Sequence, residues 1–266
     1  MSRIENAIHE IHKLDNMSDQ DQWMNNVHPL VKLLLTIGYI ALVVSFGKYD
    51  IMGLLGMAVY PIAMFILGDI PVKSTFARLK VVLPLVCFIG LFNPFFDKTL
   101  VTFYGITVRA GVISMVTLML KGVFSVLASY FLIATTSIEK LCYALRLLHV
   151  PKIMVTQIML TYRYIVLLLN EVGRMTAAYS LRAPGQKGIH FKVWGSLTGQ
   201  LLLRSMDRAT VVYESMTLRG YNGDFTYIGE KDRFKGSDLV YFLFFAGLFV
   251  FLRVCPVIVV VGGLFQ

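Results

Sequence analysis

Five apolar blocks constrain the fold of this chain more than any other feature of its sequence. They lie at about 30–46, 51–68, 81–96, 106–134 and 239–264, and roughly 20 apolar residues suffice for an α-helix to cross a bilayer. Lipid offers backbone polar groups no partner, so such blocks cross as helices. The 266-residue chain is 56% hydrophobic and 15% charged, with a mean hydropathy of +0.68, too apolar for one soluble core of ordinary size. We therefore expect an all-α integral membrane protein with about five transmembrane helices.

The basic residues indicate how the chain is oriented. Fourteen of the 25 Lys and Arg fall between 135 and 238, three lie at 69–80 and two in the first 29 residues. Cytoplasmic loops carry the excess of positive charge. This pattern predicts a cytoplasmic leader at 1–29 without a signal peptide, four transmembrane helices in 30–134, a cytoplasmic region at 135–237, and a fifth transmembrane helix in 238–266 that ends outside. Orientation and anionic lipid account for the net charge of +9, so no nucleic-acid partner is expected.

Residue patterns for catalysis, nucleotide binding or metal binding are weak. The segment 68–74 ends like a phosphate-binding loop, but Val72 stands where a glycine must let the backbone wrap a phosphate. His9 and His12 are spaced i, i+3 rather than the i, i+4 of zinc proteases, which favours a solvated helix face. The cysteines are far apart and expected to be inert: Cys87, Cys142 and Cys255. We predict no catalytic residue, no metal site and no cofactor in this chain.

Two cations fall inside predicted transmembrane helices. Lys121 lies in the fourth block and Arg253 in the fifth, and a cation within a bilayer needs a polar partner or a route to the interface. We favour a long or tilted helix that carries both side chains close to the interface or to a neighbouring subunit. The alternative is that they line a substrate path.

The region at 135–237 has three amphipathic helical patterns, at about 138–148, 152–181 and 191–219. Each carries apolar residues at helical spacing with charges on other faces. We expect these helices to be too polar to cross the bilayer and too apolar to stand in water. They fit a cytoplasmic bundle that packs on the membrane domain and shows a face to a partner.

A short arginine motif occurs twice in this region, 37 residues apart. The two copies are Ser180-Leu181-Arg182-Ala183 and Thr217-Leu218-Arg219-Gly220. Both end a helical pattern, where the helix dipole favours a cation, and Gly220 suits the left-handed cap position. A guanidinium there can make forked hydrogen bonds with a carboxylate or carbonyl of another protein. We predict partner docking at Ser180, Leu181, Arg182, Ala183, Leu218, Arg219 and Gly220; the alternative is that the arginines cap their own helices.

Several segments together resemble the transmembrane T component of energy-coupling factor ABC transporters, most closely the cobalt-type CbiQ family. They are His28-Pro29-Leu30-Val31-Lys32, Asn93-Pro94-Phe95, Thr135-Thr136, Leu148-His149-Val150-Pro151, Tyr162-Arg163-Tyr164, Leu203-Arg204-Ser205 with Arg208, and Met216-Thr217-Leu218-Arg219-Gly220-Tyr221-Asn222-Gly223. The sequence departs from the family at His28, where Asp is common, and at Ala183, where Gly is common.

The resemblance implies a non-catalytic scaffold in a prokaryotic cell membrane. In that family, helices ending in the arginine motifs couple two cytoplasmic ATPase subunits, which bind the ATP, to a membrane subunit that captures the substrate; a small accessory membrane subunit can join them. The resemblance names cobalt as first cargo, for cobalamin biosynthesis, with nickel next. The alternatives are a T component for vitamin capture and, with less support, an integral membrane enzyme.

Overall fold

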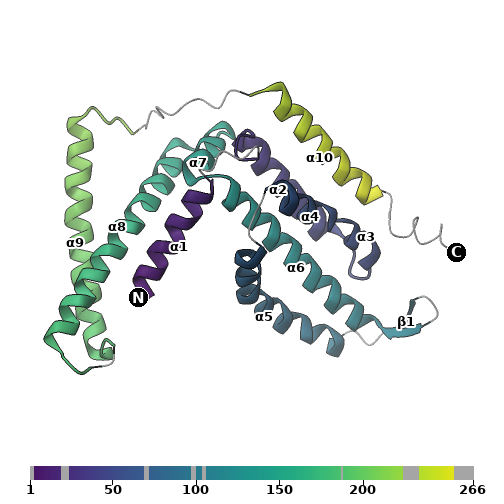
Figure 1. Ribbon diagram of the computed structural model, residues 1–266, viewed down its shortest axis with the longest axis horizontal. Coiled ribbons are helices and arrows are strands. Elements are labelled where there is room, and N and C mark those ends of the chain that lie inside the picture. The colour runs from purple at the N-terminus through teal and green to yellow at the C-terminus, as the bar shows by residue number, and fades with distance from the viewer. Residues whose placement is uncertain are drawn as a thin grey trace. The chain divides into compact units, whose positions relative to one another are not determined.

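The computed structural model describes residues 3–18, 24–68, 72–96, 100–103, 106–186, 188–223 and 234–254. Its elements are α1 (Arg3–Ser18), α2 (Pro29–Ser45), α3 (Ile51–Gly56), α4 (Val59–Leu67), α5 (Val72–Phe96), β1 (Leu100–Phe103), β2 (Ile106–Arg109), α6 (Ala110–Thr135), α7 (Ile138–Leu147), α8 (Lys152–Arg182), α9 (Phe191–Leu218) and α10 (Gly236–Val254) (Figure 1). The chain divides into two compact units, residues 18–137 with 231–266 and residues 1–17 with 138–230. The all-α membrane fold is confirmed, with one short hairpin added.

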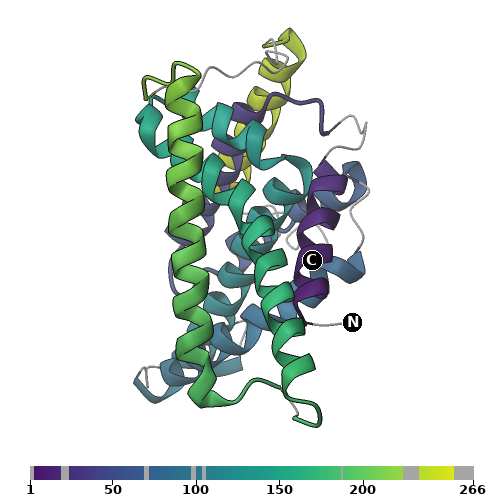
Figure 2. The ribbon, with the colours of Figure 1, turned by 90° about the vertical axis from the view of Figure 1, so that its left-hand side faces the viewer.

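The first unit is organised around α6. This helix packs along α5 and also contacts α2, α3 and α4, while α10 packs on α2 and α3 (Figures 1 and 2). A Cβ added at Gly122 of α6 would lie 2.9 Å from Val86 of α5, and one at Gly90 of α5 would lie 3.3 Å from Met115. These two glycines therefore allow the close approach of α5 and α6, as small residues do between membrane helices.

The second apolar block forms two helices, α3 and α4, rather than one. The turn between them includes Met57 and Ala58, and Pro61 follows in the first turn of α4. Proline has no N–H to donate to the carbonyl four residues earlier, which is that of Met57. The Tyr39 hydroxyl of α2 donates to this carbonyl at 2.9 Å, and the Tyr60 N–H lies 3.4 Å from it. A fully buried tyrosine thus compensates the break.

Other boundaries also differ from the expected blocks. α5 begins at Val72, nine residues before the expected start, so residues 72–80 are helical rather than a loop. α6 begins at Ala110, because residues 106–109 pair as β2 with β1 in antiparallel register, with Val101 opposite Val108. α10 begins at Gly236, and the end of the expected fifth block lies outside the described residues.

Length and composition identify three membrane-crossing candidates among the described residues: α6, α8 and α10. α2 and the stretch Ile51–Leu67 are shorter apolar helices. By length and composition alone α8 is thus apolar enough to cross, although we expected the helix at 152–181 to be too polar. Its first half is dense in large apolar residues, and its charges concentrate toward its end, so an apolar window of sufficient length remains.

The second unit contains α1, α7, α8 and α9. α7 packs on α8 and buries Cys142, whose thiol pKa is raised by burial and by nearby Glu139. α7 ends with His149 in the left-handed region at φ 61°, after which Pro151 precedes α8. The Tyr162 hydroxyl of α8 donates to Asp15 of α1 at 2.5 Å, so α1 contacts the bundle.

Candidate functional site

The two arginine motifs stand at opposite ends of α9. Arg182 is the last residue of α8, nine positions before α9 begins, whereas Arg219 is the residue that caps the far end of α9. α9 has 28 residues, and at a rise of 1.5 Å per residue it is about 42 Å long. The expectation that both motifs end helices is confirmed. The structure does not bring them together; it separates them by the length of one helix.

A regular C-terminal cap fixes the backbone at Arg219. The Tyr221 N–H donates to the Met216 carbonyl at 3.0 Å, and the Gly220 N–H donates to the Thr217 carbonyl, also at 3.0 Å. Gly220 takes φ 82°, the left-handed conformation of this motif, which a residue with a Cβ adopts at a cost. The predicted left-handed cap at Gly220 is confirmed, and it holds Arg219 at the helix end.

The leucine in each motif is exposed to an unusual degree for an apolar side chain. Leu181 is 83% exposed and Leu218 is 89% exposed. The other predicted docking residues are exposed as well, except Ala183, which is half-buried: Ser180, Arg182, Arg219 and Gly220. Within the described ranges neither the Arg182 nor the Arg219 guanidinium makes a hydrogen bond or ion pair, so neither side chain satisfies a carbonyl at the end of its own helix there. Each motif thus presents a leucine and a cation outward.

α9 as a whole lacks a buried side. None of its residues is buried, although it carries apolar side chains along its length. Its large exposed residues are Phe191, Trp194, Leu202, Leu203, Met206, Val211, Tyr213 and Leu218. An apolar surface of this kind on one helix marks an interaction site with protein or membrane.

A cluster of charges connects α8 and α9 near the first motif. Glu171 of α8 accepts hydrogen bonds from Arg204 of α9 and, with its other oxygen, from Arg174 one turn along α8. The bond from Arg204 and then the bond from Arg174 hold the pKa of Glu171 below its usual range. These residues line a groove of about 810 Å³ together with Arg182 and Gln200. From the sequence these residues are charges on the polar faces of two separate helices. Only the i, i+3 spacing of Glu171 and Arg174 indicated a contact between two of them.

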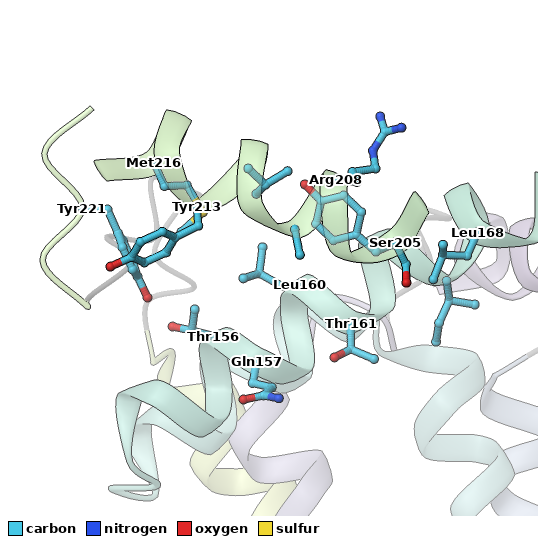
Figure 3. A pocket seen from close by; sticks show the side chains of 14 residues that line it. Thr156, Gln157, Leu160, Thr161, Leu168, Ser205, Arg208, Tyr213, Met216 and Tyr221 are labelled. Carbon is cyan, nitrogen blue, oxygen red and sulfur yellow. The ribbon is translucent and has the colours of Figure 1, made fainter. Parts of the chain in front are cut away.

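A second cavity, of about 540 Å³, lies between other parts of the same two helices (Figure 3). Apolar side chains and hydroxyls line it from both sides, among them Thr156, Leu160, Thr161, Tyr213, Met216 and Tyr221. In Figure 3 the labelled Leu160 comes from α8 and Tyr213 from α9, while the Arg208 guanidinium points away from α8. No sequence pattern predicts this cavity.

The two cations expected within transmembrane helices share one partner, the C-terminal end of α2. Lys121 donates to the carbonyls of Val44 at 3.1 Å and Phe46 at 2.5 Å. Arg253 donates to the Ser45 carbonyl at 3.4 Å and lies over the Phe46 ring at 4.1 Å. The last carbonyls of a helix lack intrahelical partners, so α2 supplies what each cation requires.

The N-terminal end of α2 connects two of the segments on which the family resemblance rests, and it also contacts α10. His28 caps α2, since its Nδ1 accepts from the Leu30 N–H at 3.2 Å, so the side chain that replaces the common Asp still starts the helix. Lys32, only 5% exposed, donates to the Thr135 carbonyl at 2.8 Å. The His28 N–H donates to Asp238 of α10 at 3.3 Å. These bonds connect α2, α6 and α10.

Comparisons with known proteins agree with this architecture. The chain matches the family described as cobalt transport protein, CbiQ, over residues 20–228. Two uncharacterized proteins of Methanocaldococcus jannaschii, MJ1571 and MJ1089, are 31% and 32% identical to it over 136 residues, which are 50% of this chain. The aligned stretch covers 46% and 48% of those proteins, so the chain spans about half the length of the curated relatives it matches. Since the family match extends over most of the chain, this helical membrane protein belongs to the cobalt transport protein family CbiQ.

Proposed function

We propose that this chain is the transmembrane coupling subunit, or T component, of an ATP-driven energy-coupling factor importer. The observation that carries the proposal is the pair of outward-facing motifs at the two ends of α9, a helix with no buried residue of its own. A helix so exposed and so apolar requires partners on its surface. The membership in a transport family supports the same conclusion.

The leucine and the arginine of each motif are suited to binding a partner protein. The exposed leucines can enter an apolar socket, while the adjacent arginine makes forked hydrogen bonds with carboxylates or carbonyls at its rim. Two motifs separated by the length of α9 are suited to two ATPase subunits, one at each end. Closure of the ATPases on ATP then displaces both ends of the helix pair, and the movement passes along α8 and α9 to the membrane partner.

The proposed topology keeps the leader at 1–29 and the region at 135–237 in the cytoplasm. α8 satisfies the length and composition of a membrane-crossing helix, but Arg163 on its surface is exposed, and a cation facing lipid is costly. Its end also carries Arg174 and Arg182. We therefore assign α8 to the coupling bundle, with the protein a multi-pass component of a prokaryotic cell membrane and its C-terminus outside.

The proposed partners are two cytoplasmic ABC ATPase subunits, a membrane subunit that captures the substrate, a possible small accessory membrane subunit, and the surrounding lipid. ATP is bound by the ATPases, and this chain has no catalytic role or cofactor. Cobalt is the proposed cargo, on the basis of the family, with nickel second and a vitamin third. Cargo choice belongs to the capture subunit, so its identity decides among these three.

The test is co-purification and uptake with both motifs altered. Replacing one interface arginine by alanine costs about 2 kcal/mol or more, roughly a 30-fold loss of affinity. Arg182→Ala and Arg219→Ala should each weaken ATPase co-purification and ATP-dependent cobalt uptake in proteoliposomes, and the double variant should lose both. Lys192→Ala, which removes an exposed cation of α9 outside either motif, should retain both. Full uptake by the double variant, with Lys192→Ala also active, would rule out the docking role.

A further inference from the structure

The two large cavities between α8 and α9 meet at one point of the helix pair. Residues 156–168 of α8 and 205–216 of α9 line the cavity of about 540 Å³. Residues 171–182 of α8 and 193–204 of α9 line the groove of about 810 Å³. On α8 the lining of the first cavity ends at Leu168 and that of the second begins at Glu171. On α9 the boundary lies between Ser205 and Arg204. The two cavities therefore lie on either side of the level of Glu171 and Arg204 along the helix pair, the level that we call the crossing.

Glu171 is the residue that joins the helices at this crossing. Both of its oxygens are used, one by Arg204 across the crossing and one by Arg174 on its own helix. Its side chain is 15% exposed, whereas those of Arg174 and Arg204 are 69% and 57% exposed. A carboxylate held from two sides by charged donors has a defined orientation. Because the arginines are exposed, the pairs contribute little to overall stability; what they can fix is geometry.

We propose that Glu171 is a positioning residue that clamps α9 to α8 through Arg204 and so fixes the angle at which the two helices cross. Since Arg182 ends α8 and Arg219 ends α9, this angle sets where the second motif stands relative to the first. The consequence for transport rests on the proposed coupling function. The clamp itself does not, and it can be tested in the chain without partners.

The test measures the opening between the helices directly. Spin labels are attached to cysteines introduced at Ile153 near the start of α8 and Ser215 near the end of α9, both exposed, in a background without the native cysteines. These positions lie on the same side of the crossing, so their separation depends on the crossing angle. Pulsed electron paramagnetic resonance on the full chain in lipid nanodiscs should give one narrow distance population for the parent and a broad distribution for Glu171→Gln.

Four further variants decide the interpretation. Glu214→Gln makes the same chemical change at an exposed site of α9 and should leave the distance narrow. Arg204→Gln should broaden it as Glu171→Gln does, and the double variant should be no broader than either single variant, as expected for partners in one contact. Arg204→Lys, which keeps the charge, should restore part of the narrow population. Helical circular dichroism and monodisperse gel filtration establish that each variant is folded.

The outcomes separate the clamp from the coupling function. An unchanged narrow distance in folded Glu171→Gln overturns the clamp, whatever the transport result. A broadened distance with full ATP-dependent uptake leaves the clamp standing and removes its role in coupling. A broadened distance with reduced uptake, while Arg182→Ala and Arg219→Ala retain activity, supports the clamp and contradicts the docking proposal.

Discussion

Single polar side chains in the first unit are placed where the backbone leaves a carbonyl to be satisfied. Tyr39 donates to the Met57 carbonyl beside the α3–α4 break, and Lys121 and Arg253 donate to the end of α2. An unsatisfied polar group in apolar surroundings is costly. Removal of such a donor therefore has a local effect that can be measured one residue at a time.

Tyr39→Phe tests this for the α3–α4 break. The side chain is fully buried and keeps its ring contacts with Tyr60 and Phe249, so the change removes the hydroxyl alone. Loss of one such hydrogen bond should lower the free energy of unfolding by about 1 kcal/mol, measured by denaturant titration in detergent. Tyr213→Phe removes a hydroxyl from a side chain that is 64% exposed and should have no effect; equal losses in the two variants would contradict the explanation.

The charge of Glu171 gives a pH dependence to the helix crossing. Arg204 and Arg174 lower its pKa, and Arg182 and Tyr179 are the other ionisable side chains lining its groove. A lowered carboxyl pKa keeps the contact intact above the ordinary glutamate value of about 4.3 and releases it as the pH falls through the folded-state pKa. The distribution of distances between labels at positions 153 and 215 should stay narrow until the pH falls to the lowered pKa of Glu171, and should then broaden reversibly. Glu171→Gln should show no such transition.

At the level of the element, α9 depends on its ends, because its length is not buried. His190 caps the start, with its Nδ1 accepting from the Lys192 N–H at 3.4 Å, and Gly220 terminates the helix in the left-handed conformation. Its caps thus stabilise α9 in part, whereas α6 is stabilised by its buried packing.

Gly220→Ala should disturb the end of α9 and the direction of Arg219. Nothing lies within 4 Å of a Cβ added there, so the cost comes from the backbone at φ 82° and is about 1 kcal/mol. We expect weaker ATPase co-purification and faster amide hydrogen exchange in the last turn of α9. Gly199→Ala is the matched control, since it also has open space but lies inside the helix; it should stabilise α9 by a similar amount. Equal behaviour of the two variants would contradict a backbone origin.

At the level of the whole molecule, the two units differ in the packing that stabilises them. The unit around α6 has a buried aromatic core with Tyr39, Tyr60, Phe131, Phe245 and Phe249, whereas α9 has no buried residue. Regions with few buried apolar contacts open most readily. The second unit is therefore expected to gain its protection from partners.

Limited proteolysis should report that difference. In the purified chain, trypsin should cut first at the exposed arginines of α8 and α9. If the proposed ATPase subunits dock there, cleavage at Arg182 and Arg219 should be suppressed when they are bound. Cleavage at Arg163, which lies outside both motifs, should not change and serves as the internal reference for the rate of digestion. Equal cleavage at Arg182 and Arg219 with and without bound ATPases would contradict docking at these residues.

The sequence predicted the features that depend on local chemistry. The ends of α8 and α9 and the Gly220 cap follow from composition, dipole and backbone preference, and these were found. The starts of the third, fourth and fifth apolar blocks were not. The break at Met57 was missed because an unbroken apolar run hides a proline compensated from another helix. The Glu171–Arg204 contact was missed because it joins residues 33 positions apart, and nothing in either helix specifies its neighbour across the crossing.

The contacts that α10 makes with both ends of α2 have a consequence for biogenesis. Asp238 accepts from His28 at the start of α2, and Arg253 donates to Ser45 at its end. The ribosome makes α2 well before α10, which begins at Gly236, so α2 waits in the translocon or the lipid, incompletely bonded, until α10 has emerged. The contacts of α2 are therefore completed only after α10 is made, and insertion factors have that interval in which to hold α2.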